Sequence, residues 1–223
     1  MTPRTTLATA AWQTFHRGWI AAVLAGMVLP ALAVLLTNAA LLPLRHGPIL
    51  ALGLMGMGMI AAATAARLRV GVALALLTGV GLIGLAQLRG MVALPHPMST
   101  ALALLIASVS FAARGTLFTR AHPHHGWIIA VLVVGGEAAT LLTASWLPAW
   151  LLVLLPAQWA SAAIQTSITG SGTLAAASVL VALAGTATTT LLVARLLPRR
   201  WPYALMFTVW LALSFLVARH PAP

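Results

Sequence analysis

The stretch that defines the fold most clearly is residues 124–145, HHGWIIAVLVVGGEAATLLTAS. A short polar segment leads into an apolar run long enough for a membrane-spanning helix. Glu137, the one acidic side chain in the 223-residue chain, follows ten residues after Trp127. At about 1.5 Å of rise per residue, Glu137 lies about 15 Å into a hydrocarbon core roughly 30 Å thick. An ionisable group at that depth is costly, so Glu137 is a candidate functional residue.

The composition of the whole chain indicates a polytopic helical membrane protein. Apolar residues make up 61% of the sequence and charged residues 6%, and the mean hydropathy is +1.04. So few polar side chains cannot cover the surface of a water-soluble domain. The apolar runs are continuous, which favours helices over the alternating strands of a membrane barrel. The sequence therefore predicts one all-α integral membrane domain over residues 1–223.

The strong positive charge has an explanation other than nucleic-acid binding. The net charge of +11 comes from 12 basic residues, all of them arginines. They stand singly or in small groups at the ends of apolar runs, where arginines determine topology and contact anionic lipids. We therefore expect a lipid bilayer and no nucleic acid as partner. The chain has no cysteine, which excludes disulfides and cysteine-ligated metals. No cofactor is identified by these patterns.

Seven segments have the length and apolarity of a membrane span. They are residues 19–43, 48–66, 70–88, 99–114, 124–145, 172–194 and 201–218. Residues 1–18 are expected to lie at the membrane interface before the first span. Pro30 predicts a kink in that span. The alternating glycines and methionines of 48–66 predict a surface for close helix packing.

Residues 149–166 are an eighth candidate crossing, interrupted by a proline and several polar residues. If this segment does not cross, nine arginines lie on the cytoplasmic side and three outside; if it crosses, the split is seven against five. The positive-inside rule prefers the first arrangement, with a cytoplasmic N-terminus. A crossing would also place Trp159 near mid-membrane. We therefore predict seven spans and a re-entrant or interfacial segment near 149–166.

A weak internal repeat supports the alternative of eight spans. Residues 16–24 and 124–132 share seven of nine residues. A duplication relating residues 16–90 to 124–199 would give both halves the same number of crossings, as in transporters built from repeats. Arginines and tryptophans near the span ends are expected at the membrane interface: Arg67, Arg69, Arg114, Arg120, Arg195, Arg199, Arg200, Trp19, Trp127, Trp146, Trp150 and Trp159.

The chemistry of the spans centres on Glu137. No arginine is expected inside a span, so a hydroxyl is the expected partner. Thr186 and Thr190 lie at a similar depth of the span 172–194, and a hydrogen bond from one of them to Glu137 is predicted. Glu137 is then either a proton- or cation-binding carboxylate or a protonated carboxyl that links two helices. These two roles stay open.

The three histidines His122, His124 and His125 are weak candidates for a metal site. Three imidazoles can bind zinc, but no carboxylate or cysteine stands near them in the sequence. A solvated basic loop at the lipid headgroups is the stronger interpretation.

No catalytic constellation is visible, because the chain has no aspartate, no pair of carboxylates and no histidine within a span. We expect a multi-pass inner-membrane protein that is not an enzyme. The favoured role is a non-catalytic subunit or scaffold that packs against other membrane proteins, copies of itself, lipids or pigments. The alternative is a small proton- or cation-coupled transporter or channel that uses Glu137, with a hydrophobic substrate as one option.

Overall fold

The computed structural model describes residues 15–36, 46–92, 94–169, 176–196 and 202–219, and these residues form an all-helical fold without strands. Within these described residues, five helices are long and apolar enough to cross a membrane: Phe15–Leu36, which includes η1 (Leu24–Val28) and α2 (Leu29–Leu36), α3 (His46–Ala65), α4 (Leu68–Leu88), α5 (Pro97–Ala121) and α10 (Ala177–Leu196). Two further apolar stretches are shorter: α6 (Gly126–Leu142) and Thr208–Arg219 within α11 (Pro202–Arg219).

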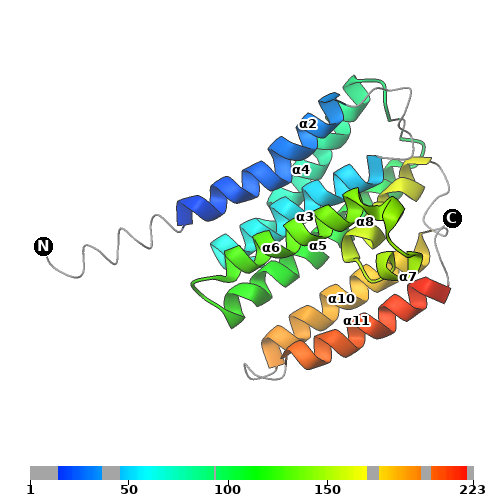
Figure 1. Ribbon diagram of the computed structural model, residues 1–223. Helices are drawn as coiled ribbons and strands as arrows, with labels where there is room; N and C mark the ends of the chain where they lie inside the picture. The colour runs from blue at the N-terminus through cyan, green and yellow to red at the C-terminus, as the bar shows by residue number, and fades with distance from the viewer. Residues whose placement is uncertain (1–14, 37–45, 93, 170–175, 197–201, 220–223) are drawn as a thin grey trace, which may run out of the picture.

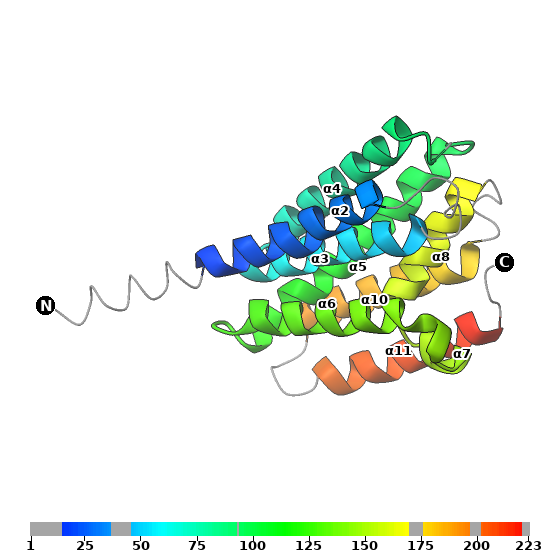
Figure 2. The ribbon, with the colours of Figure 1, turned by 45° about the horizontal axis from the view of Figure 1, so that its top comes forward.

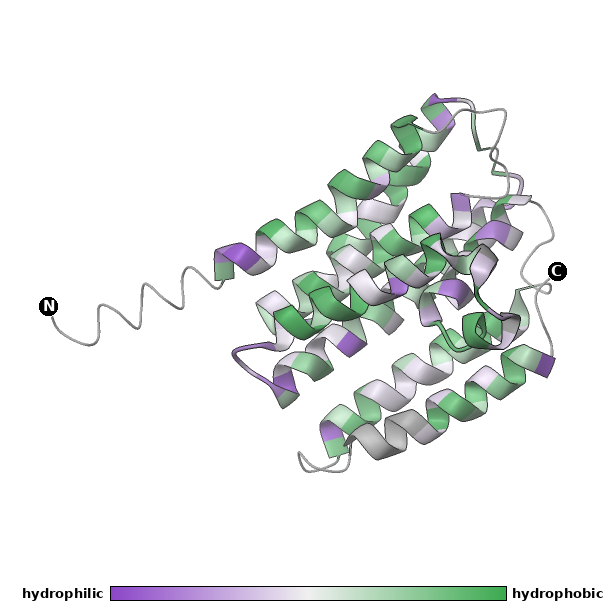
Figure 3. Ribbon diagram, viewed as in Figure 1, coloured by the Kyte–Doolittle hydropathy of each residue, from purple (hydrophilic) through white to green (hydrophobic). Residues whose placement is uncertain are grey.

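The long helices lie side by side in a bundle (Figures 1 and 2). Figure 3 shows hydrophobic residues along most of the helical surface, whereas hydrophilic residues gather at helix ends and in the loop between α5 and α6. This distribution is the one that a lipid solvent requires. The prediction of an all-helical chain with several apolar helices of spanning length is confirmed.

The centre of the bundle is α3, which packs against the helix 15–36, α4, α5, α6 and α8 (Pro156–Thr169). A helix that is apolar on every side is buried on every side, and α3 is such a helix. Its glycines allow the close approaches: a Cβ on Gly56 would meet the Ala25 carbonyl at 2.8 Å, and one on Gly58 would meet Ala75 at 3.1 Å. The predicted packing surface of 48–66 is therefore confirmed.

The irregularity predicted at Pro30 begins one turn earlier. Residues Leu24–Val28 form a π-helical turn, and α2 continues from Leu29. Proline lacks a backbone N–H and its ring collides with the carbonyl one turn before it, so a wider turn at this place relieves the collision.

The direction of the helices shows where the chain between α6 and α10 goes. Ser110 and Arg114 of α5 contact Thr186 of α10, and Arg120 contacts the carbonyl of Ala194. Residue numbers increase in the same direction along these contacts in both helices, so α5 and α10 run parallel. The close turn between α5 and α6 makes α6 antiparallel to both. The chain therefore leaves α6 and enters α10 at the same end of the bundle.

Between these helices, the chain forms η3 (Ala144–Trp146), α7 (Ala149–Leu152) and α8. The first residues of α8 lie inside the bundle beside Glu137, and its second half reaches the start of α3, where the Gln165 amide oxygen accepts from the Gly47 N–H at 2.9 Å. The helices of this segment are shorter than the candidate spans.

The expected interfacial position of Trp159 is wrong. Its side chain is only 1% exposed, within α8, and the indole N–H donates to the Val153 carbonyl at 2.7 Å. The segment inserts between α3, α5 and α10, so the aromatic ring fills the core.

Candidate functional site: a cavity between two buried charges

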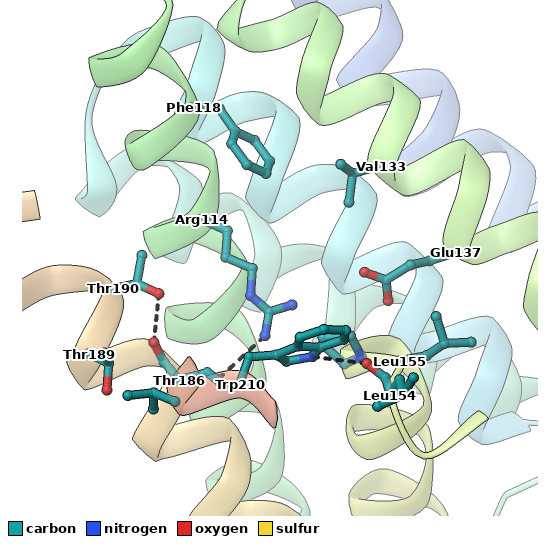
Figure 4. A pocket seen from close by; sticks show the side chains of 12 residues that line it. Arg114, Phe118, Val133, Glu137, Leu154, Leu155, Thr186, Thr189, Thr190 and Trp210 are labelled. Carbon is teal, nitrogen blue, oxygen red and sulfur yellow. Dashed lines mark hydrogen bonds between the residues drawn. The ribbon is translucent and has the colours of Figure 1, made fainter. Parts of the chain in front are cut away.

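A cavity of about 450 Å³ lies between α5, α6, α10, α11 and the break before α8 (Figure 4). This volume is within the roughly 300–1,000 Å³ of small-molecule sites. Most of its wall is apolar. The residues that line it are Arg114, Phe118, Val133, Glu137, Leu154, Leu155, Pro156, Thr186, Thr189, Thr190, Val209 and Trp210. We call it the Arg114–Glu137 cavity.

Arg114 overturns two expectations. It was predicted at the interface, and no arginine was expected inside a span, yet its side chain is 7% exposed and points into the cavity (Figure 4). The reason is the length of α5, which continues seven residues beyond Arg114 to Ala121. At about 1.5 Å per residue, Arg114 therefore lies roughly 10 Å from the end of the helix.

The guanidinium of Arg114 has few protein partners. One N–H donates to the Thr186 hydroxyl at 3.4 Å, and the group lies 5.8 Å from the centre of the Phe111 ring. Thr186 in turn shares a 3.2 Å hydrogen bond with Ser110. A guanidinium has five N–H donors. Most of its donor capacity is thus directed at the cavity rather than at protein acceptors within the described residues.

Glu137 is bound to the backbone of the α8 segment. Its Oε2 accepts from the Ala157 N–H at 2.8 Å, and its side chain is 9% exposed. Ala157 follows Pro156, the first residue of α8, so the carboxylate caps the N-terminus of that helix. The predicted hydrogen bond from Thr186 or Thr190 is not formed: Thr186 bonds Ser110 and Arg114, and the Thr190 hydroxyl donates to the Thr186 carbonyl at 2.6 Å. Both threonines nevertheless line the same cavity as Glu137.

Two indoles satisfy the backbone where α7 and α8 are interrupted. Trp159 donates to the Val153 carbonyl, and Trp210 of α11 donates to the Leu154 carbonyl at 2.9 Å. Irregular backbone at membrane depth is tolerated only where protein groups bond its N–H and C=O groups. The Glu137 carboxylate accepts from the Ala157 N–H. Three side chains from three elements therefore satisfy the backbone groups at this break beside the cavity.

The two charges face each other across the cavity (Figure 4). Arg114 is near enough for its charge to act on the Glu137 carboxylate, but no direct ion pair joins them in the described part of the chain. Buried opposite charges gain most when they are in contact and fully hydrogen-bonded. An arrangement in which they stay apart leaves room for a third group between them.

The other predicted site residues lie elsewhere. Arg67, Arg69, Arg120 and Arg195 are exposed near helix ends; Trp146 and Trp150 are 87% and 65% exposed, and Trp19 and Trp127 are half-buried. Arg199, Arg200 and most of the predicted interfacial segment 1–18 fall outside the described residues. His122, His124 and His125 are exposed in the turn between α5 and α6, and no grouping of three metal-binding side chains occurs in the described ranges.

Sequence reasoning missed Arg114 and Trp210 as members of the site. A signal for Arg114 was present: the apolar, small-residue pattern continues after it through Gly115, Leu117 and Phe118. That continuation distinguishes an arginine within a long helix from one at its end. Trp210 carried no comparable signal, since its role depends on the position of the Leu154 carbonyl.

Comparisons of the chain with models of protein families, with curated proteins and with solved structures found no match.

Proposed function

We propose that the protein is a small membrane carrier that binds a solute in the Arg114–Glu137 cavity and couples its passage to a proton on Glu137. The observation that carries this proposal is the pair of buried opposite charges that face one cavity without direct contact. A purely structural pair would be most stable when closed. A cavity between the charges suits a molecule that enters and leaves.

The re-entrant segment supports the same proposal. Carriers commonly bind solutes where a membrane helix is interrupted, because helix ends present free backbone groups to the site. Here the start of α8 lies at the cavity, and Glu137 occupies its Ala157 N–H. A change in the charge of Glu137 would change this contact. Protonation therefore has a direct structural route to the movement of α8.

The proposed topology has seven spans, with α6 and α11 as the shorter ones and the segment near 149–166 as re-entrant. Arg67 stands between α3 and α4, Arg69 lies in the first turn of α4, and Arg120 and Arg195 stand at the ends of the parallel helices α5 and α10, all at the end of the bundle where the helix 15–36 begins. By the positive-inside rule this end is cytoplasmic, and the membrane is an inner membrane.

The test uses proteoliposomes that contain a pH-sensitive dye. A panel of small anionic, cationic and neutral solutes is added outside, and the internal pH is followed for wild type and Glu137→Gln. The glutamine keeps an oxygen for the Ala157 N–H but cannot take up a proton, so we expect at least one solute to change internal pH in wild type and none in the variant.

Arg69→Gln is the matched control, since it removes an exposed arginine from α4 far from the cavity lining. Equal reconstitution of all three proteins is checked by gel. If no solute moves protons in wild type, or if Glu137→Gln behaves as wild type, the carrier proposal is wrong.

A subunit or scaffold role is the second candidate. One observation favours it: Gly135 and Gly136 are exposed on α6, and a Cβ on either would meet no atom within 4 Å. Small residues on an open helix face allow another membrane helix to approach closely. Native mass spectrometry after gentle extraction separates the candidates. Other proteins at fixed stoichiometry would support the subunit role, and a monomer or homo-oligomer the carrier.

A further inference from the structure

The substrate class can be inferred from the charges of the cavity, provided that the proposed carrier function holds. We propose that the Arg114–Glu137 cavity binds a small monovalent organic anion together with one proton. The anionic group lies between the Arg114 guanidinium and Glu137, and the apolar part of the molecule lies against Phe118, Val133 and Leu155.

The Arg114 guanidinium is the group that binds the anion. Arg114 is the only cation among the cavity-lining residues, and its single hydrogen bond within the described chain is the 3.4 Å contact to the Thr186 hydroxyl. A guanidinium with free N–H donors binds carboxylates and sulfonates through paired, charge-assisted hydrogen bonds. The hydroxyls of Thr186, Thr189 and Thr190 donate to backbone carbonyls of α10, so the donors for an anion come from Arg114.

The net charge of the cavity determines whether a proton binds together with the anion. With Glu137 ionised and no solute bound, the cavity has no net charge. A bound anion alone would give it a net charge of −1 in an apolar interior, which is costly. If Glu137 takes up one proton as the anion binds, the net charge is again zero. Anion and proton are therefore bound and released together.

A cationic solute does not fit this balance. It would have to replace the proton on Glu137, and Arg114 would then leave the cavity with a net charge of +1 in both states. Among the described residues that line the cavity, Arg114 of α5 is the charged group that faces Glu137, and α10, α11 and the break before α8 present hydroxyl, indole and aliphatic groups. The His46 of α3 does not line the cavity.

The apolar lining of the cavity determines the rest of the ligand. The apolar part of the cavity lining consists of leucine, valine, proline and aromatic side chains, and the Trp210 indole among them is held by its hydrogen bond to the Leu154 carbonyl. Such a wall gains free energy by covering apolar surface of the ligand. The preferred ligand therefore has one charged end and a short apolar body.

The test is isothermal titration calorimetry on the purified full-length protein in detergent, at pH values from 5 to 8. The probes are hexanesulfonate, hexylammonium and hexanol, which differ in charge but share the same chain. Hexanesulfonate stays ionised throughout. We expect it to bind best, with a Kd that rises by up to tenfold per pH unit, the slope of one linked proton.

Three single variants of the cavity, one double variant and one control separate the contributions of the two charges. In Glu137→Gln the affinity for hexanesulfonate should no longer depend on pH. In Arg114→Lys the charge remains and binding should weaken less than in Arg114→Gln, where a loss of at least tenfold is expected. Because Arg114→Gln leaves Glu137 without its opposite charge, the neutral double variant Arg114→Gln/Glu137→Gln serves as a second test and measures background partition into micelles. Arg69→Gln should bind as wild type.

The outcomes distinguish this inference from the proposed function. Binding of hexylammonium that strengthens as pH rises and disappears in Glu137→Gln would overturn the anion and leave a cation carrier. Preference for hexanol would likewise overturn the anion. If no probe binds wild type better than the double variant, both the anion and the solute-binding cavity are wrong. Added anionic phospholipid that competes with hexanesulfonate would identify a lipid rather than a dissolved acid as the source of the anion.

Discussion

At the scale of single residues, the backbone carbonyls of Val153 and Leu154 explain why tryptophan is needed in two places. Each carbonyl lies where no helix satisfies it, and each accepts from an indole N–H, from Trp159 and Trp210 respectively. Tryptophan supplies a large apolar surface together with one donor, which is the combination that a buried interruption of a helix requires.

We expect Trp159→Ala to destabilise the protein strongly. Removing a fully buried aromatic side chain costs about 3–5 kcal/mol, and the unpaired Val153 carbonyl adds about 1–3 kcal/mol. Trp150→Ala is the matched control, because Trp150 is 65% exposed and should change stability by less than about 1 kcal/mol. Unfolding of both variants in detergent, followed by circular dichroism, measures the difference. Equal losses would contradict the buried position of Trp159.

From the sequence, Glu137 could be placed in the middle of an apolar helix, but its partners could not be predicted. Depth follows from counting residues along one apolar run, so it needs no tertiary information. Partners depend on how other elements fold against the run. The Ala157 N–H meets Glu137 because Pro156 begins a helix inside the bundle, and the sequence of residues 149–166 does not show that this helix start lies beside Glu137.

At the scale of elements, the contact between α3 and α5 depends on glycine. A Cβ on Gly115 would collide with the Met59 carbonyl oxygen and would also lie 3.1 Å from the Ala62 Cβ. Backbone atoms cannot move aside as a flexible side chain can. The two helices are therefore as close as their main chains permit.

Gly115→Ala is expected to push α3 and α5 apart and to cost about 1–3 kcal/mol, the usual penalty for overpacking. Gly84→Ala on α4 is the matched control, since nothing lies within 4 Å of a Cβ there. It should be neutral or stabilising by up to about 1 kcal/mol, because alanine favours the helix. The apparent melting temperatures in one detergent provide the comparison; a Gly115→Ala protein as stable as wild type would show that the helices are not in close contact.

Most helix positions could be predicted, because continuous apolar runs between arginines and prolines are strong signals. The buried position of Arg114 could not, since this arginine was taken as the end of the span although Leu117 and Phe118 lie beyond it. The segment near 149–166 was ambiguous for a physical reason: α8 is buried against other helices, so its polar residues face protein groups and no longer follow the pattern of a lipid-facing span.

At the scale of the whole molecule, the parallel directions of α5 and α10 require the chain between α6 and α10 to return to the end at which it started. Sequence could predict this only through the balance of arginines. The structure reaches the same geometry through hydrogen bonds such as that of Ser110 with Thr186. The candidate repeat of residues 16–90 and 124–199 stays a prediction.

Labelling of single cysteines tests the topology in native membranes. The chain has no cysteine of its own, so each variant carries one thiol. His124→Cys, Trp146→Cys and Thr169→Cys place it at exposed positions. We expect an impermeant maleimide to reach Trp146→Cys and Thr169→Cys from one side and His124→Cys from the other. Labelling of Thr169→Cys from the same side as His124→Cys would mean that residues 149–166 cross, as the eight-span alternative requires.

The cavity beside the Trp210–Leu154 hydrogen bond is built from elements that are synthesised at different times. Arg114 and Glu137 are made early, whereas Thr186 and Trp210, which line the opposite wall of their cavity, belong to the last two helices. The elements that carry the two charges therefore precede in synthesis the elements that enclose them, and the cavity is complete only when α10 and α11 have packed against α5 and α6.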